Sequence, residues 1–287
     1  VEDYDELTVP EVGCVLTAGV DVQHDRLAVI IRAWGPGEES WLLYWGEISG
    51  KTMLPEKGAW PDLDALLSRK FAGPNGTQLR IRAVSIDSSD GQTSDAVYTF
   101  VRKRMSRGFM AIKGSSVNDD SKEIFTTPKP SVDLNGQQKS VKFGLKPFIV
   151  GTSRAKDLIL GVDANAGRIK LEGRGPGRMH WYKGVRPDYW EQITSEVKAP
   201  ASHSARRVWQ KKSGVRNEAL DCEVYALHAA RSLKLHLWSP ARWDQEKSTQ
   251  LQMDLLSTEA PKKPEEKKEA PVARDDFFNA FNGNNSW

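Results

Sequence analysis

The chain has 287 residues, of which 39% are hydrophobic and 28% charged, and a net charge of +3, a composition typical of a soluble globular protein with a sizeable core. It holds no apolar run approaching the roughly 18–20 residues that span a bilayer, and its acidic start, VEDYDELTVPE, lacks the apolar core of a signal peptide. Its two cysteines, Cys14 and Cys222, lie far apart in apolar segments, which excludes a cysteine-built zinc site and suggests buried thiols in a reducing compartment.

The first part of the chain predicts an antiparallel meander of strands. Residues 14–23 are apolar and rich in β-branched side chains, Arg26–Trp34 alternates between apolar and polar residues, and residues 40–48 form a third such run. The short, turn-forming segments between these runs are typical of neighbouring antiparallel strands.

The next segment predicts a βαβ unit, preceded by a helix over residues 61–71. Residues 79–86 have strand character, residues 93–107 have helical spacing, and residues 109–113 are typical of a short buried strand. We therefore expect an α/β protein whose mixed sheet joins an antiparallel meander to parallel strands and is flanked by helices.

The second half predicts further strands and helices after a polar excursion over residues 114–141. In chain order we expect a strand over residues 148–151, a helix over 153–160, a strand over 168–171, helices over 189–197 and 215–235, and a last helix over 241–256. Residues 1–11 are expected to be a linker, residues 12–238 one domain, and residues 239–287 a helical and then largely disordered tail, because its second half is charged and rich in proline.

Three aspartates stand where an unpaired acid is costly. Asp21 lies inside an apolar, β-branched strand, Asp87 ends a second apolar strand, and Asp221 lies on the apolar side of the helix over residues 215–235. Carboxylates that meet at the edge of a core repel one another, and a divalent cation is the usual remedy. Two Mg²⁺ or Mn²⁺ ions held by these three acids would activate water and stabilise the leaving oxygen in phosphodiester hydrolysis.

Each aspartate also has a structural explanation, and spacing alone does not prove that the three meet. Asp87 can cap the turn that follows it, and Asp221 can pair with Arg216 or another nearby base. Asp21 is the hardest to explain in this way. The acids that are more typical of surface, capping or supporting groups are Asp25, Asp90, Asp95, Glu191, Glu196 and Glu218.

Basic residues are concentrated in three short segments. Residues 168–186 hold six basic residues and one acid, residues 204–216 hold five and no acid, and residues 102–107 hold four. Any one cluster is equally well explained as solvated surface charge, but the interleaved Trp181, Tyr182 and Trp209 favour a phosphate-backbone surface. The candidate DNA-contacting residues are Arg174, Arg178, Lys183, Arg206, Arg207, Lys211 and Lys212.

The sequence lacks the motifs of several other classes of enzyme, namely P-loop nucleotide hydrolases, zinc proteases and serine hydrolases. The sequence has no GxxxxGK[ST] segment to cradle a nucleoside triphosphate, no HExxH pair and no GxSxG. Cys222 lies in an apolar helical segment, which is typical of an inert thiol.

Five motifs resemble, in the same order, those of the nuclease domain in lambda-type (GpA-like) phage terminase large subunits. The motifs are AGVDVQHDRL, IDSSDGQTSDAVYTFVRKR, PGRMHW, WEQITSE and RNEALDCEVYALHAAR, of which RNEALDC with its flanks is the most specific. The resemblance runs from about residue 12 to about residue 235. It departs from the family pattern at Arg178 and Trp181, where the family more often has an aromatic residue and Phe, so it assigns no substrate contact there.

This resemblance implies an RNase H-like fold in which Asp21, Asp87 and Asp221 are metal-binding catalytic acids. It implies an endonuclease that uses Mg²⁺ or Mn²⁺, two ions in all, to cut concatemeric double-stranded viral DNA during genome packaging. The implied location is the host cytoplasm, and transiently the portal of the procapsid.

The resemblance also implies partners. These are double-stranded DNA, the portal protein, the small terminase subunit and an ATPase domain that precedes the nuclease and whose P-loop is missing from this sequence; no membrane is expected. The family's tail is a usual place for portal contact, so a docking role is expected of Phe277, Phe278 and Phe281.

Two other functions stay open at this point. The chain would be a non-cleaving module that binds DNA or the portal if its acids are structural, and metal would then not stabilise the fold. It would be another RNase H-like nuclease, such as a Holliday-junction resolvase or a transposase, if it prefers branched over linear DNA.

Overall fold

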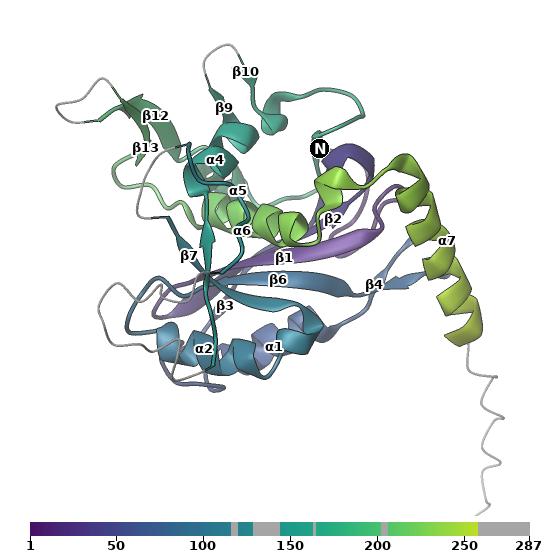
Figure 1. Ribbon diagram of the computed structural model, residues 1–287, viewed down its shortest axis with the longest axis horizontal. Helices are drawn as coiled ribbons and strands as arrows, with labels where there is room; N and C mark the ends of the chain where they lie inside the picture. Colours follow the sequence, from purple (N-terminus) through teal and green to yellow (C-terminus); the bar gives the residue numbers. More distant parts are fainter. Residues whose placement is uncertain (116–119, 129–143, 163–164, 202–205, 258–287) are drawn as a thin grey trace, which may run out of the picture.

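A seven-stranded mixed sheet in the order β11-β3-β2-β1-β6-β7-β8 forms the centre of the molecule (Figure 1). The structure is a computed structural model that describes residues 1–115, 120–128, 144–162, 165–201 and 206–257. The predicted fold class is confirmed: the sheet combines antiparallel and parallel strands and is flanked by helices, consistent with an RNase H-like fold. Within the described residues, no helix has the length and apolar character that crossing a membrane requires.

The predicted antiparallel meander forms one half of the sheet. Strands β1 (Val15–Val22), β2 (Arg26–Trp34) and β3 (Ser40–Ser49) pair antiparallel in sequence order. Every residue of β1 is buried, because this central strand is covered on both faces, and such strands are apolar nearly throughout rather than alternating.

The predicted βαβ unit forms the other half. Strand β6 (Ile81–Asp87) lies parallel to β1, helix α2 (Ser94–Arg102) follows, and β7 (Phe109–Gly114) lies parallel to β6. The sheet is completed by β8 (Phe148–Val150), parallel to β7, and by β11 (Met179–Trp181), parallel to β3.

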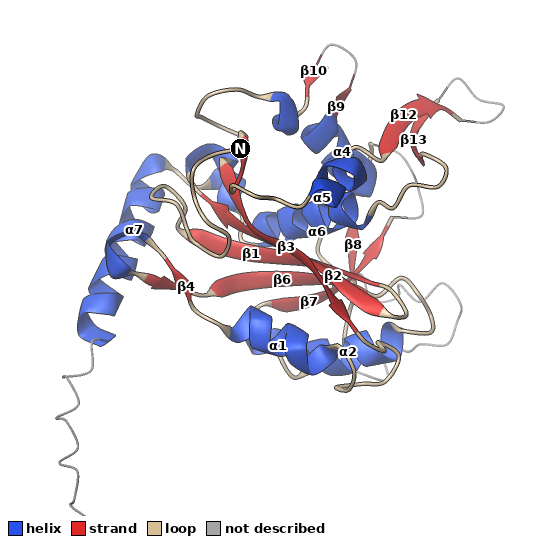
Figure 2. Cartoon of the chain, turned by 180° about the vertical axis from the view of Figure 1, so that it is seen from behind, coloured by secondary structure: helices blue, strands red, loops and turns tan. Residues whose placement is uncertain are grey.

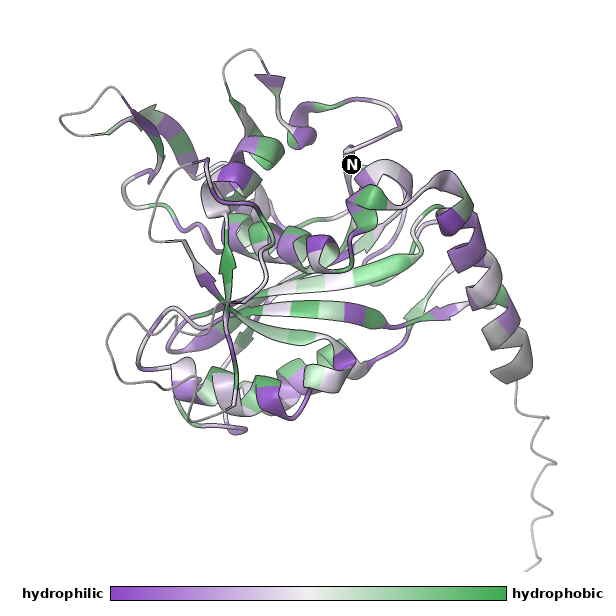
Figure 3. Ribbon diagram, viewed as in Figure 1, coloured by the Kyte–Doolittle hydropathy of each residue, from purple (hydrophilic) through white to green (hydrophobic). Residues whose placement is uncertain are grey.

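Helices cover both faces of the sheet (Figure 2). Helices α1 (Trp60–Ser68) and α2 pack on one face, and α4 (Thr152–Leu160), α5 (Pro187–Ile193) and α6 (Glu218–Ser232) lie on the other. The apolar residues therefore form two core clusters, one on each side of the sheet, and Figure 3 shows the strands between them coloured mainly white to green while the helices carry purple polar positions.

Helix α6 approaches β1 unusually closely, and Gly19 permits it. A Cβ at Gly19 would lie 2.1 Å from the carbonyl oxygen of Cys222 and 2.6 Å from the amide nitrogen of Ala226. The hydroxyl of Thr17, two residues away on the same face of the strand, donates a 2.9 Å hydrogen bond to the carbonyl of Ala226. The face of β1 that carries residues 17, 19 and 21 is thus fixed against α6.

Several expected elements differ in type or extent. The helix expected over residues 93–107 ends at Arg102, and the one expected over residues 61–71 ends at Ser68. Residues 168–171, expected as a strand, contain the 3-10 turn Arg168–Lys170, in which Arg168 lies against Glu38 and donates a 2.6 Å hydrogen bond to it. The helix expected over residues 189–197 ends at Ile193, and β12 (Glu196–Pro200) follows and pairs with β13 (Arg207–Lys211). Neither β13 nor β11 was expected from the sequence, since both are short and polar or aromatic.

The remaining elements are short, apart from one terminal helix. The short strands are β4 (Phe71–Ala72), β5 (Gln78–Leu79), β9 (Gly161–Val162) and β10 (Asn165–Ala166). Helix α7 (Pro240–Ser257), which begins the segment expected as a tail, lies on the opposite side of the molecule from the β12–β13 hairpin (Figure 1), and its Trp243 is buried in the core.

The first eleven residues, expected as a linker, lie against the domain. The amide of Glu2 donates to the carbonyl of Trp181, the amide of Leu7 donates to the carbonyl of Leu43, and Val9 is buried. These contacts tie the segment to strands β11 and β3, so it packs as part of the domain surface.

Candidate active site

The sheet places the three candidate aspartates at one end of its central strands. Asp21 is the penultimate residue of β1 and Asp87 is the last residue of β6. These strands are parallel neighbours, and their register sets Val20 beside Ile86, so that each aspartate follows directly. Asp221 lies in the first turn of α6, the helix that crosses this face of the sheet. The packing of α6 on β1 therefore brings the third acid to the first two.

The three carboxylates are close enough to perturb one another. Burial raises the pKa of Asp21 well above its usual range, and the carboxylates of Asp221 and Asp87 raise it further. Tyr225, one turn along α6 from Asp221, is buried among them: burial raises the pKa of its phenol, and the charges of all three aspartates add to that. The prediction that these residues converge, which spacing alone did not establish, is supported by this shared electrostatic neighbourhood.

The pKa values of the other two carboxyl groups are raised as well. Burial raises the pKa of Asp87 to about 6, against the opposing effect of hydrogen bonds from Ser89. Burial likewise raises the pKa of Asp221, while the ammonium of Lys156 opposes the rise and the carboxylate of Glu196 adds to it. Crowded carboxylates with raised pKa values are the state that a bound cation relieves, because it favours the charged forms.

Each aspartate is engaged by neighbouring polar groups. Gln23 donates a 2.6 Å hydrogen bond to Asp21 Oδ2. The hydroxyl and backbone amide of Ser89 donate to Asp87 Oδ1 at 2.7 and 3.2 Å. These bonds hold the side chains of Asp21 and Asp87 in fixed orientations next to one another.

Asp221 belongs to a polar network that the sequence did not reveal. Lys156 Nζ, on α4, lies 2.7 Å from Glu196 Oε1 and 3.2 Å from Asp221 Oδ1. The side-chain amide of Asn217 donates to the same two acids, at 3.0 Å to Glu196 Oε1 and 2.8 Å to Asp221 Oδ2. Sequence reasoning ranked Glu196 among the secondary acids and missed Lys156, because a lysine in a short helix of mixed polar and apolar residues is too common to single out.

The donor set fits a divalent cation in kind, although the side chains are turned toward protein partners. Three aspartates from three elements supply the hard oxygen ligands that Mg²⁺ and Mn²⁺ prefer. Among the described residues, no three His, Cys, Asp or Glu side chains stand ready in an arrangement that holds a metal ion. The carboxylate oxygens of the three aspartates instead contact protein donors, among them Gln23, Ser89 and Lys156.

One of the two predicted DNA-contacting clusters lies on and around β13, and its member Lys211 lies near Asp221. Arg207 and Lys211 are exposed on β13, in the hairpin that projects from the domain at the upper left of Figure 1. The positive charge of Lys211 reaches Asp221 and lowers its pKa. Arg206 and Lys212, the other members of this cluster, are exposed at the two ends of the same strand.

The other predicted cluster lies elsewhere, near the sheet edge formed by β11. Lys183 Nζ is 3.1 Å from both Asp3 and Asp5, and Arg174 is 3.7 Å from Glu2. The guanidinium of Arg178 lies 5.6 Å from the centre of the Trp181 ring. The structure thus sets Arg174 and Lys183 against the acidic start of the chain rather than beside the three aspartates. Phe277, Phe278 and Phe281 lie outside the described residues.

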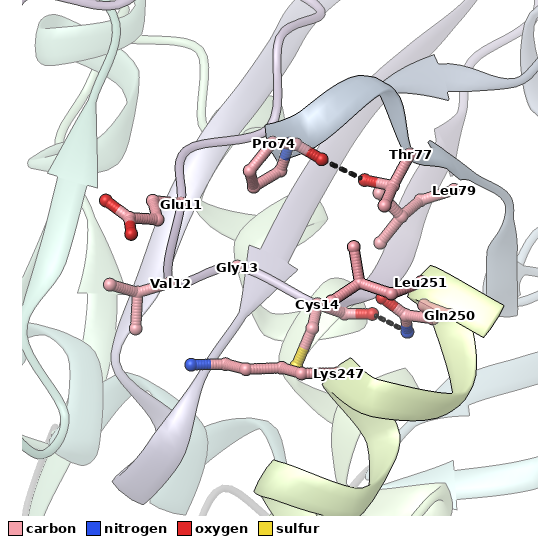
Figure 4. Close-up of a pocket in the computed structure, with 10 residues that line it drawn as sticks. All are labelled: Glu11, Val12, Gly13, Cys14, Pro74, Thr77, Leu79, Lys247, Gln250 and Leu251. Atoms are coloured by element: carbon pink, nitrogen blue, oxygen red, sulfur yellow. Dashed lines mark hydrogen bonds between the residues drawn. The ribbon is translucent and has the colours of Figure 1, made fainter. Parts of the chain in front are cut away.

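A cavity of about 220 Å³ lies at the start of β1, away from the acids (Figure 4). It is lined by the segment Glu11 to Cys14, by the β4–β5 turn and by Lys247, Gln250 and Leu251 of α7. Asp21 is near the far end of the same strand, so this cavity is separate from the candidate active site.

Comparisons with known proteins agree with the site's chemistry. Residues 1–243 match a family described as "Terminase large subunit gpA, endonuclease domain". The chain is 31% identical over 234 residues to the terminase large subunit of Escherichia phage lambda, covering 78% of this chain and 33% of the relative. It is 29% identical over 240 residues to the terminase large subunit of Enterobacteria phage P21, covering 80% of this chain and 34% of the relative. The chain therefore spans about a third of the length of these curated relatives. No solved structure gives a significant match.

Proposed function

The chain belongs to the family of terminase large subunit gpA endonuclease domains, and from this premise we propose that it cuts concatemeric double-stranded viral DNA with divalent metal ions held by Asp21, Asp87 and Asp221. The observation that carries the proposal is the meeting of three buried or half-buried aspartates from two parallel strands and one helix. A structural role explains this poorly, because three carboxylates in one electrostatic neighbourhood destabilise the fold unless something neutralises them.

The proposed chemistry is metal-assisted hydrolysis of the phosphodiester bond. Bound Mg²⁺ or Mn²⁺, two ions in the usual arrangement, supplies an activated water and stabilises the leaving oxygen. Asp21 and Asp87 approach from the sheet and Asp221 approaches from α6. The two strands and the helix that carry these aspartates would hold such ions at this end of the sheet.

The basic hairpin supplies the DNA contact in this proposal. Arg207 and Lys211 are exposed on one strand of a two-stranded ribbon, and Lys211 lies near Asp221. Exposed cations of this kind neutralise backbone phosphates regardless of sequence. Lys183 and Arg174 have acidic partners within the domain, so they contribute less to this surface.

The activity and partners of the whole packaging machine are proposed by similarity, since the chain spans about a third of its relatives. These partners are an ATPase domain, the portal protein and the small terminase subunit, and the place of action is the host cytoplasm and the procapsid portal. Phe277, Phe278 and Phe281 of the tail are the candidates for portal contact.

Plasmid cleavage tests the proposal directly. The protein is incubated with supercoiled DNA in Mn²⁺, in Mg²⁺ and in EDTA, beside Asp21→Asn and the matched control Asp25→Asn, an exposed acid in the turn after β1. We expect nicking or linearisation that needs metal, is lost in Asp21→Asn and is retained in Asp25→Asn. Full activity of Asp21→Asn would refute the assignment, and a strong preference for branched over linear duplex would favour a resolvase instead.

Metal binding shows whether the metal site exists even if the protein does not cleave DNA under the conditions used. Mn²⁺ is expected to raise the melting temperature of the wild-type protein but not that of Asp21→Asn. Absence of both cleavage and stabilisation would favour the non-cleaving DNA- or portal-binding module.

A further inference from the structure

Lys156 is a buried lysine whose contacts lie wholly within the acidic site. Its side chain is 10% exposed, and its ammonium bridges Glu196 Oε1 at 2.7 Å and Asp221 Oδ1 at 3.2 Å. An ammonium removed from water is costly unless acids surround it. Here the two acids that surround it come from different elements, β12 and α6.

Both carboxylate oxygens of Asp221 have a protein partner. Oδ1 faces the ammonium of Lys156, and Oδ2 accepts the hydrogen bond from Asn217. Each oxygen keeps a second lone pair, so a cation that takes Asp221 as a ligand shares the carboxylate with these partners or displaces one of them. Lys156 is the partner whose charge also opposes the incoming cation.

Lys156 could stay paired with Glu196 if it moved away from Asp221. The ammonium is closer to Glu196 than to Asp221, and Glu196 is buried while Asp221 is 20% exposed. Withdrawal of Lys156 toward Glu196 would leave the lysine paired and free Asp221 Oδ1 of its contact with the ammonium.

We propose that Lys156 is a positioning residue that acts as a built-in counter-ion of the site: it holds Asp221 next to Glu196 in the metal-free protein and competes with the divalent cation for Asp221. This inference rests on the proposed function, since it takes Asp221 as a metal ligand. It makes Lys156 a determinant of metal affinity rather than a group that touches the DNA.

The chain contains a matched control for this arrangement. Lys198 Nζ bridges Asp120 at 3.0 Å and Asp157 at 2.7 Å, and its side chain is 8% exposed. It is therefore a lysine of similar burial between two acids, but it contacts none of the three site aspartates in the described structure. Loss of an ion pair alone affects both lysines, whereas loss of competition with a metal affects only Lys156.

The test is calorimetric titration of Mn²⁺ at mildly alkaline pH into the wild type, Lys156→Met, Lys156→Arg and Lys198→Met. Removing one positive charge at contact distance is expected to lower the Kd of Lys156→Met by about ten-fold. Lys156→Arg keeps the charge and is expected to stay within about three-fold of the wild type. Lys198→Met is expected to bind Mn²⁺ as the wild type does. Lys156→Gln replaces Lys156→Met if the latter does not fold.

The outcomes separate this inference from the proposed function. An unchanged or weaker Mn²⁺ affinity in folded Lys156→Met, with the wild type still binding, overturns the role of Lys156 and leaves the metal site standing. Equal tightening in Lys198→Met also overturns it, because the effect would then not be local. If neither the wild type nor Lys156→Met binds Mn²⁺, the metal requirement itself fails and the inference fails with it.

Discussion

The buried histidine of α6 makes the stability of the domain depend on pH in a predictable direction. His228 is fully buried, its Nδ1 lies 2.8 Å from the hydroxyl of Ser85, and its ring packs against Phe125 and Phe148. None of these neighbours carries a charge, and burial lowers the pKa of the imidazole to about 3. The folded protein therefore keeps His228 neutral where the unfolded chain protonates it.

The sign and size of the effect follow from proton linkage. Because the pKa is lower in the folded state, the contribution to stability is fully present above the unfolded pKa of about 6.5 and is lost as the pH falls toward about 3. Each pH unit in that window removes about 1.4 kcal/mol. Lowering the pH from 7 to 5 should therefore cost about 2 kcal/mol of unfolding free energy through His228 alone.

Urea unfolding at the two pH values tests this with His228→Asn, whose amide can keep the hydrogen bond to Ser85. The variant should lose about 2 kcal/mol less than the wild type between pH 7 and pH 5, whatever its stability at pH 7. His236→Asn, which replaces an exposed histidine just after α6, should keep most of the wild-type dependence. Equal losses in wild type and His228→Asn would refute the reasoning.

Two further predictions concern charge on the surface and in the core. Lys211→Gln should weaken binding to duplex DNA and lower the slope of log affinity against log salt by about one. Lys183→Gln should change the affinity and the slope less, because the ammonium of Lys183 already pairs with acids. Fluorescence anisotropy across a salt series measures both quantities. Glu223→Gln should destabilise the domain by about 3–5 kcal/mol in urea unfolding, because the buried guanidinium of Arg32, 2.5 Å from Glu223, loses its counter-charge; a loss below about 1 kcal/mol would show that the pair is replaceable.

The sequence predicted the sheet well because its strands have strong local signals. The segment Arg26–Trp34 was predicted with its observed bounds, and the apolar run that became β1 needed no long-range information. By contrast, β11 and the β12–β13 hairpin are short and polar or aromatic, and their pairing depends on tertiary contacts. The helix expected over residues 189–197 overlaps the first two residues of β12, and the rest of that strand was not expected.

Some residues of the candidate site were predictable from the sequence, and others only from the fold. Three site residues were predictable from the sequence, Asp21, Asp87 and Asp221, because each is an acid within an otherwise apolar segment. Lys156 was not, since its meaning comes from Glu196 and Asp221, which are 40 and more residues away along the chain. Arg174 and Lys183 were predicted as part of a DNA surface from local charge density, and only the fold reveals the acidic N-terminal segment that pairs with them.

The placement of the acids follows from backbone packing rather than from their own interactions. Repulsion among the three carboxylates acts to separate α6 from the strands, yet Gly19 lets the helix backbone approach β1 within contact distance, and the hydrogen bond from Thr17 to Ala226 fixes it there. The apolar packing of α6 on β1, β2 and β6 acts against this repulsion. Lys156 contributes a positive charge beside Asp221. The stored repulsion then favours cation binding, because each ion that enters relieves it without requiring the fold to move.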